Sequence, residues 1–122
     1  MKIGFIGLGN VGGKLASSLL RNKFELTVRD LDKNLTNKFL IKGAKIAKTN
    51  KELAEKADLI ITCLPSPKVC AEVMEAEDGV INGLSKNKIW LEMSTTDESE
   101  IRRLSKLVEE KNAVPLDGPV SG

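Results

Sequence analysis

The sequence predicts an α/β fold, a doubly wound parallel sheet with helices on both faces. Three observations predict this fold. Short β-rich runs alternate with helical patterns along the chain, the run ADLIITCL is apolar almost throughout, and a glycine-rich turn directly follows the first β-rich run. Alternation of this kind indicates βαβ units, and near-continuous apolar runs are typical of strands buried on both faces.

The individual elements follow from local patterns. Strands are expected at residues 2–6, 25–29, 45–47, 59–63, 89–93 and 114–117. Between them, apolar residues recur at helical spacing, as in Val11, Leu15 and Leu19 and again in the stretch 101–108. Side chains that can accept hydrogen bonds from the first amides of a helix mark three helix starts. These predicted caps are Thr49 before Glu52, Ser66 before Pro67 and Thr95 before Glu98.

Composition favours a small-molecule partner. The 122 residues suit one domain, and 41% hydrophobic and 30% charged residues are typical of a globular protein. A net charge of +2 from scattered residues and few aromatic side chains argue against a nucleic-acid surface. No apolar run has the length of a membrane span or of a secretory leader. Cys63 and Cys70, in a chain without histidine, fit no zinc template, so we expect a cytoplasmic protein without a metal site.

Three early glycines form the pattern G-x-G-x-x-G after the first strand and at the start of the first helix. In this context the first glycine allows a tight turn, the second lets a pyrophosphate approach the backbone, and the third allows close packing of helix and strand. The amides at the helix start favour phosphate. We therefore expect a Rossmann-type sheet, with a glycine-rich turn without ligand as the alternative. The expected cofactor-binding residues of the turn are Gly7, Leu8, Gly9, Asn10, Val11 and Gly12.

The second strand is expected to deliver an acidic residue to the same turn. Asp30 lies 18 residues after Gly12, close to the spacing at which a carboxylate binds the adenine-ribose hydroxyls of NAD. A solvent-exposed turn residue or a helix cap is the alternative, although Asp32 is better placed as the cap. Arg29 could stack on adenine or receive the 2′-phosphate of NADP. Because Leu31 rather than a cation follows Asp30, we expect NAD to be preferred, by about tenfold or more.

Four segments in order resemble the β-hydroxyacid dehydrogenases, a family that includes 3-hydroxyisobutyrate dehydrogenase and 6-phosphogluconate dehydrogenase. They are GFIGLGNVGGKLASSLL, ADLIITCLPSP, EMSTTD and LDGPVSG, the last being similar to the family's substrate-binding segment D-A-P-V-S-G-G. The resemblance spans the whole chain. The sequence departs from the family pattern at Val11, where Met is usual, and at Gly118, where Ala is usual.

The resemblance implies roles for residues outside the glycine turn. Leu64 and Pro65 would line the cofactor site where the strand order reverses, although a strand-ending turn also explains them. Thr95 would lie near the nicotinamide in addition to capping a helix. Ser121 and Gly122 would bind the carboxylate of a small hydroxyacid, and a plain turn is their alternative.

The activity that the resemblance implies is hydride transfer between NAD(P) and a 3-hydroxyacid, which yields a semialdehyde or keto acid. Residues 1–122 would form the dinucleotide-binding domain, truncated before the helical domain that carries the family's catalytic lysine. We therefore expect no catalytic residue within these residues and no turnover by them alone, and a homo-oligomer for the full-length protein. The alternative is a non-catalytic dinucleotide-binding or interaction module, since a fold does not fix a function.

Overall fold

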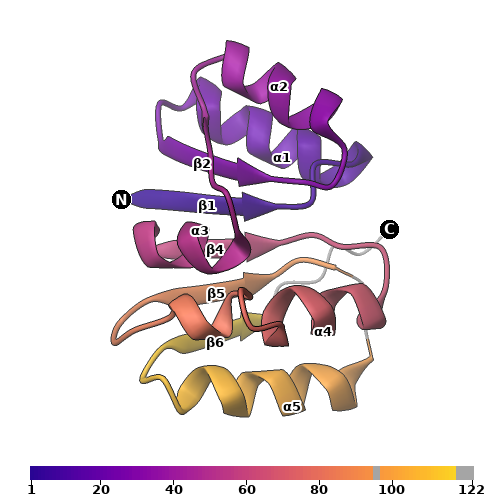
Figure 1. Cartoon of the computed structure of the whole chain (residues 1–122), viewed down its shortest axis with the longest axis vertical. Coiled ribbons are helices and arrows are strands. Elements are labelled where there is room, and N and C mark those ends of the chain that lie inside the picture. The colour runs from indigo at the N-terminus through magenta and orange to yellow at the C-terminus, as the bar shows by residue number, and fades with distance from the viewer. Residues whose placement is uncertain (95–96, 118–122) are drawn as a thin grey trace.

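Six parallel strands form the centre of the structure, in the order β3-β2-β1-β4-β5-β6 (Figure 1). This computed structural model describes residues 1–94 and 97–117. The predicted doubly wound parallel sheet is confirmed, and the third, fourth and fifth strands end one residue earlier than predicted. The strands are β1 (Lys2–Ile6), β2 (Glu25–Arg29), β3 (Lys45–Ile46), β4 (Leu59–Thr62), β5 (Ile89–Glu92) and β6 (Val114–Asp117).

The helices begin at side chains that satisfy their first amides. Thr49 accepts a hydrogen bond from the Glu52 amide at 3.0 Å and Ser66 one from the Val69 amide at 3.2 Å, as predicted. The helices are α1 (Asn10–Arg21), α2 (Lys33–Ile41), α3 (Asn50–Lys56), α4 (Pro67–Glu75) and α5 (Glu98–Glu109), with a short 3₁₀ helix η1 (Ile81–Gly83). Within residues 1–94 and 97–117, no helix has the length and apolarity needed to cross a membrane.

The predicted cap at Thr95 is wrong. The residue directly before α5 is Asp97, whose carboxylate accepts a hydrogen bond from the Ser99 amide at 2.8 Å. An aspartate in this position is as good a cap as threonine, and it lies next to the first helical residue. Thr95 itself lies outside the described residues.

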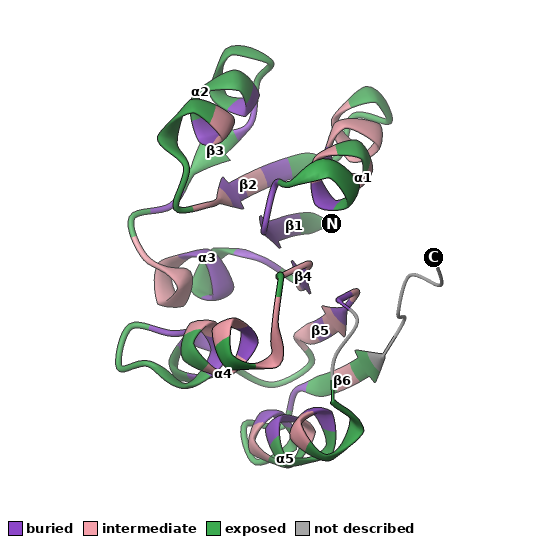
Figure 2. Cartoon of the chain, turned by 90° about the vertical axis from the view of Figure 1, so that its right-hand side faces the viewer, coloured by how far each residue is buried: buried purple, intermediate pink, exposed green. Residues whose placement is uncertain are grey.

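The helices pack on the two faces of the sheet in two hydrophobic clusters. On one face, α1 and α2 bury Ala16 and Phe39 against Phe5. On the other face, α3, α4 and α5 pack through a second cluster that includes Leu53 and the fully buried Trp90. The chain therefore changes face after β3, as Figure 2 shows from the side of the strand ends. Neighbouring strands β1 and β4 then lead into helices on opposite faces, which opens a crevice at their carboxyl ends.

One residue of the predicted apolar face of α1 lies outside the core. Leu15 and Leu19 pack against the sheet as expected, whereas Val11 is 46% exposed. Its side chain lines a cavity at the carboxyl edge of the sheet, because the first turn of α1 lies at the mouth of the crevice.

Candidate functional site

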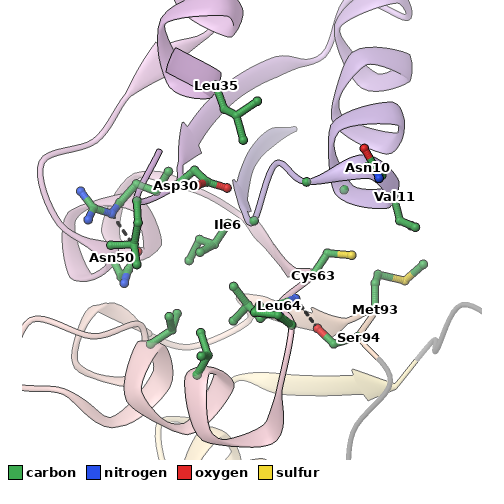
Figure 3. A pocket seen from close by; sticks show the side chains of 18 of the residues that line it. Ile6, Asn10, Val11, Asp30, Leu35, Asn50, Cys63, Leu64, Met93 and Ser94 are labelled. Carbon is green, nitrogen blue, oxygen red and sulfur yellow. Dashed lines mark hydrogen bonds between the residues drawn. The ribbon is translucent and has the colours of Figure 1, made fainter. Parts of the chain in front are cut away.

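A cavity of about 920 Å³ occupies the crevice at the carboxyl ends of the strands (Figure 3). Its walls come from the turns that follow β1, β2, β4 and β5, from the first turns of α1, α2 and α3, and from one side of α4. A volume of this size holds a large organic ligand, and ligands of open α/β sheets bind at this place. The cavity lining includes nine of the residues expected to bind a cofactor, namely Gly7, Gly9, Asn10, Val11, Gly12, Arg29, Asp30, Leu64 and Pro65.

The glycine-rich turn is closely packed against the rest of the site. Gly7 has φ +102°, a conformation that side chains disfavour, and a Cβ there would lie 2.1 Å from the carbonyl oxygen of Cys63. A Cβ at Gly12 would lie 2.0 Å from the carbonyl oxygen of Gly7. Both positions therefore require glycine, one for its backbone conformation and one for the close contact of helix and turn.

Gly9 is open toward the cavity. It precedes the first residue of α1, where no side chain caps the helix and no acidic residue occupies the first turn. A Cβ at Gly9 would meet no atom within 4 Å beyond its two chain neighbours, because Gly9 lines the cavity. The first amides of a helix lack intrahelical acceptors and lie at the positive end of its dipole, which suits a phosphate. The turn thus fits the pyrophosphate of a dinucleotide, with its charge near Gly9 and the first turn of α1.

Asp30 connects the end of β2 to the glycine turn. One oxygen of its carboxylate accepts a hydrogen bond from the Leu8 amide at 2.7 Å, and the other accepts one from the Asp32 amide at 2.8 Å. Asp32 caps α2 through the Asn34 amide, as predicted. Leu8 is 2% exposed and packs in the core, and its amide is used by Asp30; among the described residues predicted to bind a cofactor, Leu8 is the one that does not line the cavity. The Asp30 carboxylate is held at the cavity wall by these contacts, and it keeps lone pairs for a ligand.

Arg29 is engaged by the segment between β3 and α3. Its Nε donates to Oδ1 of Asn50 at 2.9 Å, and its Nη1 donates to the carbonyl oxygens of Ala47 and Lys48 at 3.0 and 2.6 Å. These contacts hold the guanidinium beside the cavity. Asn50, which sequence reasoning did not identify as a site residue, is itself part of the cavity lining.

The opposite wall is formed where β4 and β5 end. The Leu64 amide donates to Oγ of Ser94, so the turn containing Leu64 and Pro65 is attached to the end of the neighbouring strand. Cys63 and Met93 line the same part of the cavity, next to Val11 (Figure 3). No sequence pattern singled out Ser94, although it lies directly past a predicted strand, at the edge where the other predicted site residues gather.

A buried carboxylate lies behind this wall. Glu92, at the end of β5, is fully buried and accepts hydrogen bonds from Oγ1 of Thr62 at 2.7 Å, Sγ of Cys70 at 2.9 Å and the Ser94 amide. Thr62 in turn accepts a hydrogen bond from Nε1 of Trp90 at 2.9 Å. These bonds join β4, β5 and α4 and fix Ser94, which in turn holds the Leu64 amide.

The two thiols differ in position but not in the direction of their pKa shifts. Cys70 is buried in the core, and Cys63 is half-buried in the cavity wall. Burial, and secondly the nearby Glu92 carboxylate, raise the pKa of both thiols above the ordinary value. Both thiols therefore remain protonated and weakly nucleophilic near neutral pH.

Three of the expected site residues cannot be placed. Thr95, Ser121 and Gly122 lie outside the described residues, so the expected positions near the nicotinamide and the substrate carboxylate stay predictions. In the described part of the chain, no group of three or more Cys, Asp or Glu side chains could hold a metal ion.

Comparison with known proteins agrees with this geometry. Residues 2–122 match the family described as the NAD binding domain of 6-phosphogluconate dehydrogenase. The chain is 38% identical over 120 residues to the mitochondrial 3-hydroxyisobutyrate dehydrogenase of Mus musculus, covering 98% of this chain and 36% of that protein. It is 31% identical over 121 residues to the cytokine-like nuclear factor N-PAC of Pongo abelii, covering 99% of this chain and 22% of that protein.

A solved structure shows the same fold. The 3-hydroxyisobutyrate dehydrogenase from Salmonella typhimurium matches with a TM-score of 0.91 and 25% identity, covering 100% of this chain and 42% of that one. The chain thus spans between a fifth and less than half the length of these three proteins. Together with the glycine turn and Asp30, these matches show that the chain is an NAD(P)-binding Rossmann domain and belongs to the family of the NAD binding domain of 6-phosphogluconate dehydrogenase.

Proposed function

We propose that this chain is the NAD-preferring cofactor domain of an oxidoreductase that interconverts a 3-hydroxyacid and its semialdehyde or keto acid. The observation that carries the cofactor preference is the Asp30 carboxylate, fixed in the cavity wall at the end of β2. It can accept hydrogen bonds from the free ribose hydroxyls of NAD. The 2′-phosphate of NADP would remove one of these donors and bring negative charge against the carboxylate.

Arg29 gives little compensation for that repulsion. Its Nε and Nη1 already donate to Asn50, Ala47 and Lys48, so a bidentate contact with a 2′-phosphate through two nitrogens would require it to leave at least one of these acceptors, and Nη2 alone remains to donate. Each such hydrogen bond contributes about 0.5–1.5 kcal/mol. Leu31, which follows Asp30 and lines the same end of the cavity, has no charge to offer.

Titration of the chain with NADH and NADPH at one ionic strength tests this preference. NADH is expected to bind at least about tenfold more tightly, a difference on the order of 1.4 kcal/mol. The informative variant is Asp30→Asn, which keeps an acceptor for the Leu8 amide but removes the charge. This variant should reduce the preference for NADH over NADPH, mainly by improving NADPH binding. Equal or tighter binding of NADPH by the parent chain would show that Arg29, not Asp30, governs the pocket.

The proposed chemistry combines the cofactor with residues outside the described part of the chain. A bound nicotinamide supplies or accepts the hydride, while this domain orients the dinucleotide through the glycine turn, Asp30 and the turn containing Leu64. The support for a hydroxyacid substrate is the resemblance to 3-hydroxyisobutyrate dehydrogenases over almost the whole chain.

A domain exchange tests the catalytic proposal. The chain replaces the matching 120 residues of the Mus musculus relative, and the chimera is assayed with NAD and 3-hydroxyisobutyrate. Turnover supports the proposal. The matched control is the Gly12→Ala version of the same chimera, in which the glycine turn is disrupted. A chimera that binds NADH and is folded, yet gives no turnover above the control, contradicts the proposal.

The alternative function is a dinucleotide-binding or interaction module without catalysis. The similarity to the nuclear factor N-PAC, whose name states no enzymatic activity, favours keeping this alternative. The same domain exchange separates the two functions, because a module that binds NADH without orienting its nicotinamide for hydride transfer produces no turnover in the chimera.

A further inference from the structure

Asn50 presents a hydrogen-bond donor whose orientation is set by its neighbour. The Oδ1 atom of Asn50 accepts from Nε of Arg29 at 2.9 Å (Figure 3). A guanidinium carries only donors, so the oxygen of the amide must face Arg29 and the nitrogen must lie on the other side. The usual ambiguity in the orientation of an amide side chain is thereby removed.

Arg29 is itself held in place. Its Nη1 donates to the carbonyl oxygens of Ala47 and Lys48, which belong to the segment leading from β3 into α3. The guanidinium thus connects β2 to this segment and keeps the Asn50 amide in a single orientation. Reorienting Asn50 would place its NH₂ group against the guanidinium, donor against donor.

The amide nitrogen of Asn50 is available to a ligand. It makes no hydrogen bond to any residue within the ranges that the structure describes, while Asn50 is half-buried in the cavity wall. A half-buried donor of this kind gains from an acceptor that a ligand supplies.

The position of Asn50 indicates which part of a dinucleotide lies beside it. Asp30 and Asn50 lie at one end of the cavity, and Cys63, Met93 and Ser94 lie at the other (Figure 3). Because Asp30 is assigned to the adenine ribose, the end containing Asn50 is the adenosine end, and this step rests on the proposed cofactor orientation. Leu31 and Leu35 line the same end and suit the flat apolar faces of a base.

We propose that Asn50 recognises the adenine base by donating from Nδ2 to an unprotonated ring nitrogen, and that Arg29 is the positioning residue that orients Asn50 for this contact. Asn50 is thus a specificity-determining residue for the base, distinct from Asp30, which acts on the ribose. Arg29 acts through Asn50 and touches no phosphate.

The test compares ligands with and without adenine, using NMR-detected titrations that resolve millimolar dissociation constants. Asn50→Asp keeps the acceptor for Arg29 and removes the donor, and Asn50→Leu removes both at similar size. We expect both variants to bind ADP-ribose five- to twentyfold more weakly and nicotinamide mononucleotide within twofold of the parent chain. Lys51→Gln is the matched control for charge, because it changes the net charge by the same amount as Asn50→Asp at a residue outside the cavity lining.

Each outcome has a distinct meaning. ADP-ribose affinity within twofold of the parent in both variants would overturn the proposal, as would an equal loss for both ligands at an unchanged unfolding temperature. A parent chain that binds ADP-ribose, with variants that bind it as tightly as the parent, leaves dinucleotide binding intact and removes only the role of Asn50. A parent chain that binds neither ligand would refute the cofactor site as well.

The positioning role of Arg29 has its own test. Arg29→Ala should weaken ADP-ribose binding severalfold, and Arg29→Lys, which can still donate to Asn50, should restore part of it. In the Asn50→Leu background, Arg29→Ala should have no further effect on ADP-ribose affinity. Additive losses would mean that Arg29 acts independently of Asn50 and would overturn its assignment as a positioning residue.

Discussion

Replacing Gly9 by alanine should separate the stability of the domain from its ability to bind a cofactor. Gly9 has φ −66° and ψ −164°, an extended conformation that alanine adopts without strain. A Cβ there would meet no atom within 4 Å beyond its two chain neighbours. Since alanine also restricts the unfolded chain, we expect Gly9→Ala to leave the free energy of unfolding unchanged or to raise it by about 0.4–1 kcal/mol.

The same Cβ projects into the space expected to hold the pyrophosphate. Keeping the phosphate away from the first amides of α1 loses at least one hydrogen bond to a charged group, about 1.5–3 kcal/mol. The affinity for NADH should therefore fall roughly ten- to hundredfold or more. Stability and binding thus change in opposite directions.

Urea denaturation and NADH titration of the same samples measure both effects. The matched control is Gly12→Ala, where a Cβ would lie 2.0 Å from the Gly7 carbonyl oxygen, so that the variant should lose about 1–3 kcal/mol of stability or more as well as NADH binding. A Gly9→Ala chain that binds NADH as tightly as the parent would refute the placement of the phosphate. A Gly9→Ala chain as unstable as Gly12→Ala would refute the assignment of open space at Gly9.

Three further predictions concern the support of the site. Glu92→Gln should lower the free energy of unfolding, measured in urea, by about 1–3 kcal/mol, because an amide in place of the carboxylate leaves a buried donor unpaired. Unchanged stability would show that the carboxylate is dispensable. Burial raises the pKa of the Cys70 thiol, so this thiol stays protonated in the folded chain above about pH 8.5, where the same thiol of the unfolded chain ionises. The free energy of unfolding therefore falls as the pH rises above that value. Under reducing conditions, the free energy of unfolding of Cys70→Ala should fall less steeply than that of the parent chain between pH 8.5 and 10.5, by up to about 1.4 kcal/mol per pH unit. Burial lowers the pKa of Lys88, which changes stability in the opposite direction but equally in both chains. Parallel pH curves for the two chains would contradict the buried-thiol effect. Asp97→Ala should cost about 0.5–2 kcal/mol through loss of the cap of α5, and an unchanged thermal midpoint would contradict that assignment.

The features that the sequence predicted well are those with local causes. The glycine turn, the strands and the caps at Thr49 and Ser66 depend on residues within a few positions of each other, and the structure confirms them. Asp30 was found because its spacing from the turn reflects one βαβ unit. The cap at Thr95 was misassigned because Asp97 offers an equivalent acceptor nearer the start of α5.

The features that the sequence did not reveal depend on which strands become neighbours. Ser94 holds the Leu64 amide across 30 positions of sequence, and Arg29 holds Asn50 across 21. Neither pair has a local signature, because each forms only after the sheet brings separate strand ends to one edge. Glu92 likewise appears as an ordinary charged residue at a strand end until the register places it between Thr62 and Cys70.

The central claim, that a dinucleotide binds at the carboxyl ends of β1, β2 and β4, is tested most directly by mapping NAD onto the assigned amide spectrum of the chain. We expect the largest saturable shifts at the amides of residues 7–12, Asp30 and Leu64, with smaller ones at Asn50 and Ser94. The amides at the amino ends of the strands, such as Lys88, should be unaffected. Saturable shifts confined to that opposite edge, or no shifts at millimolar NAD in a folded sample, would contradict the account.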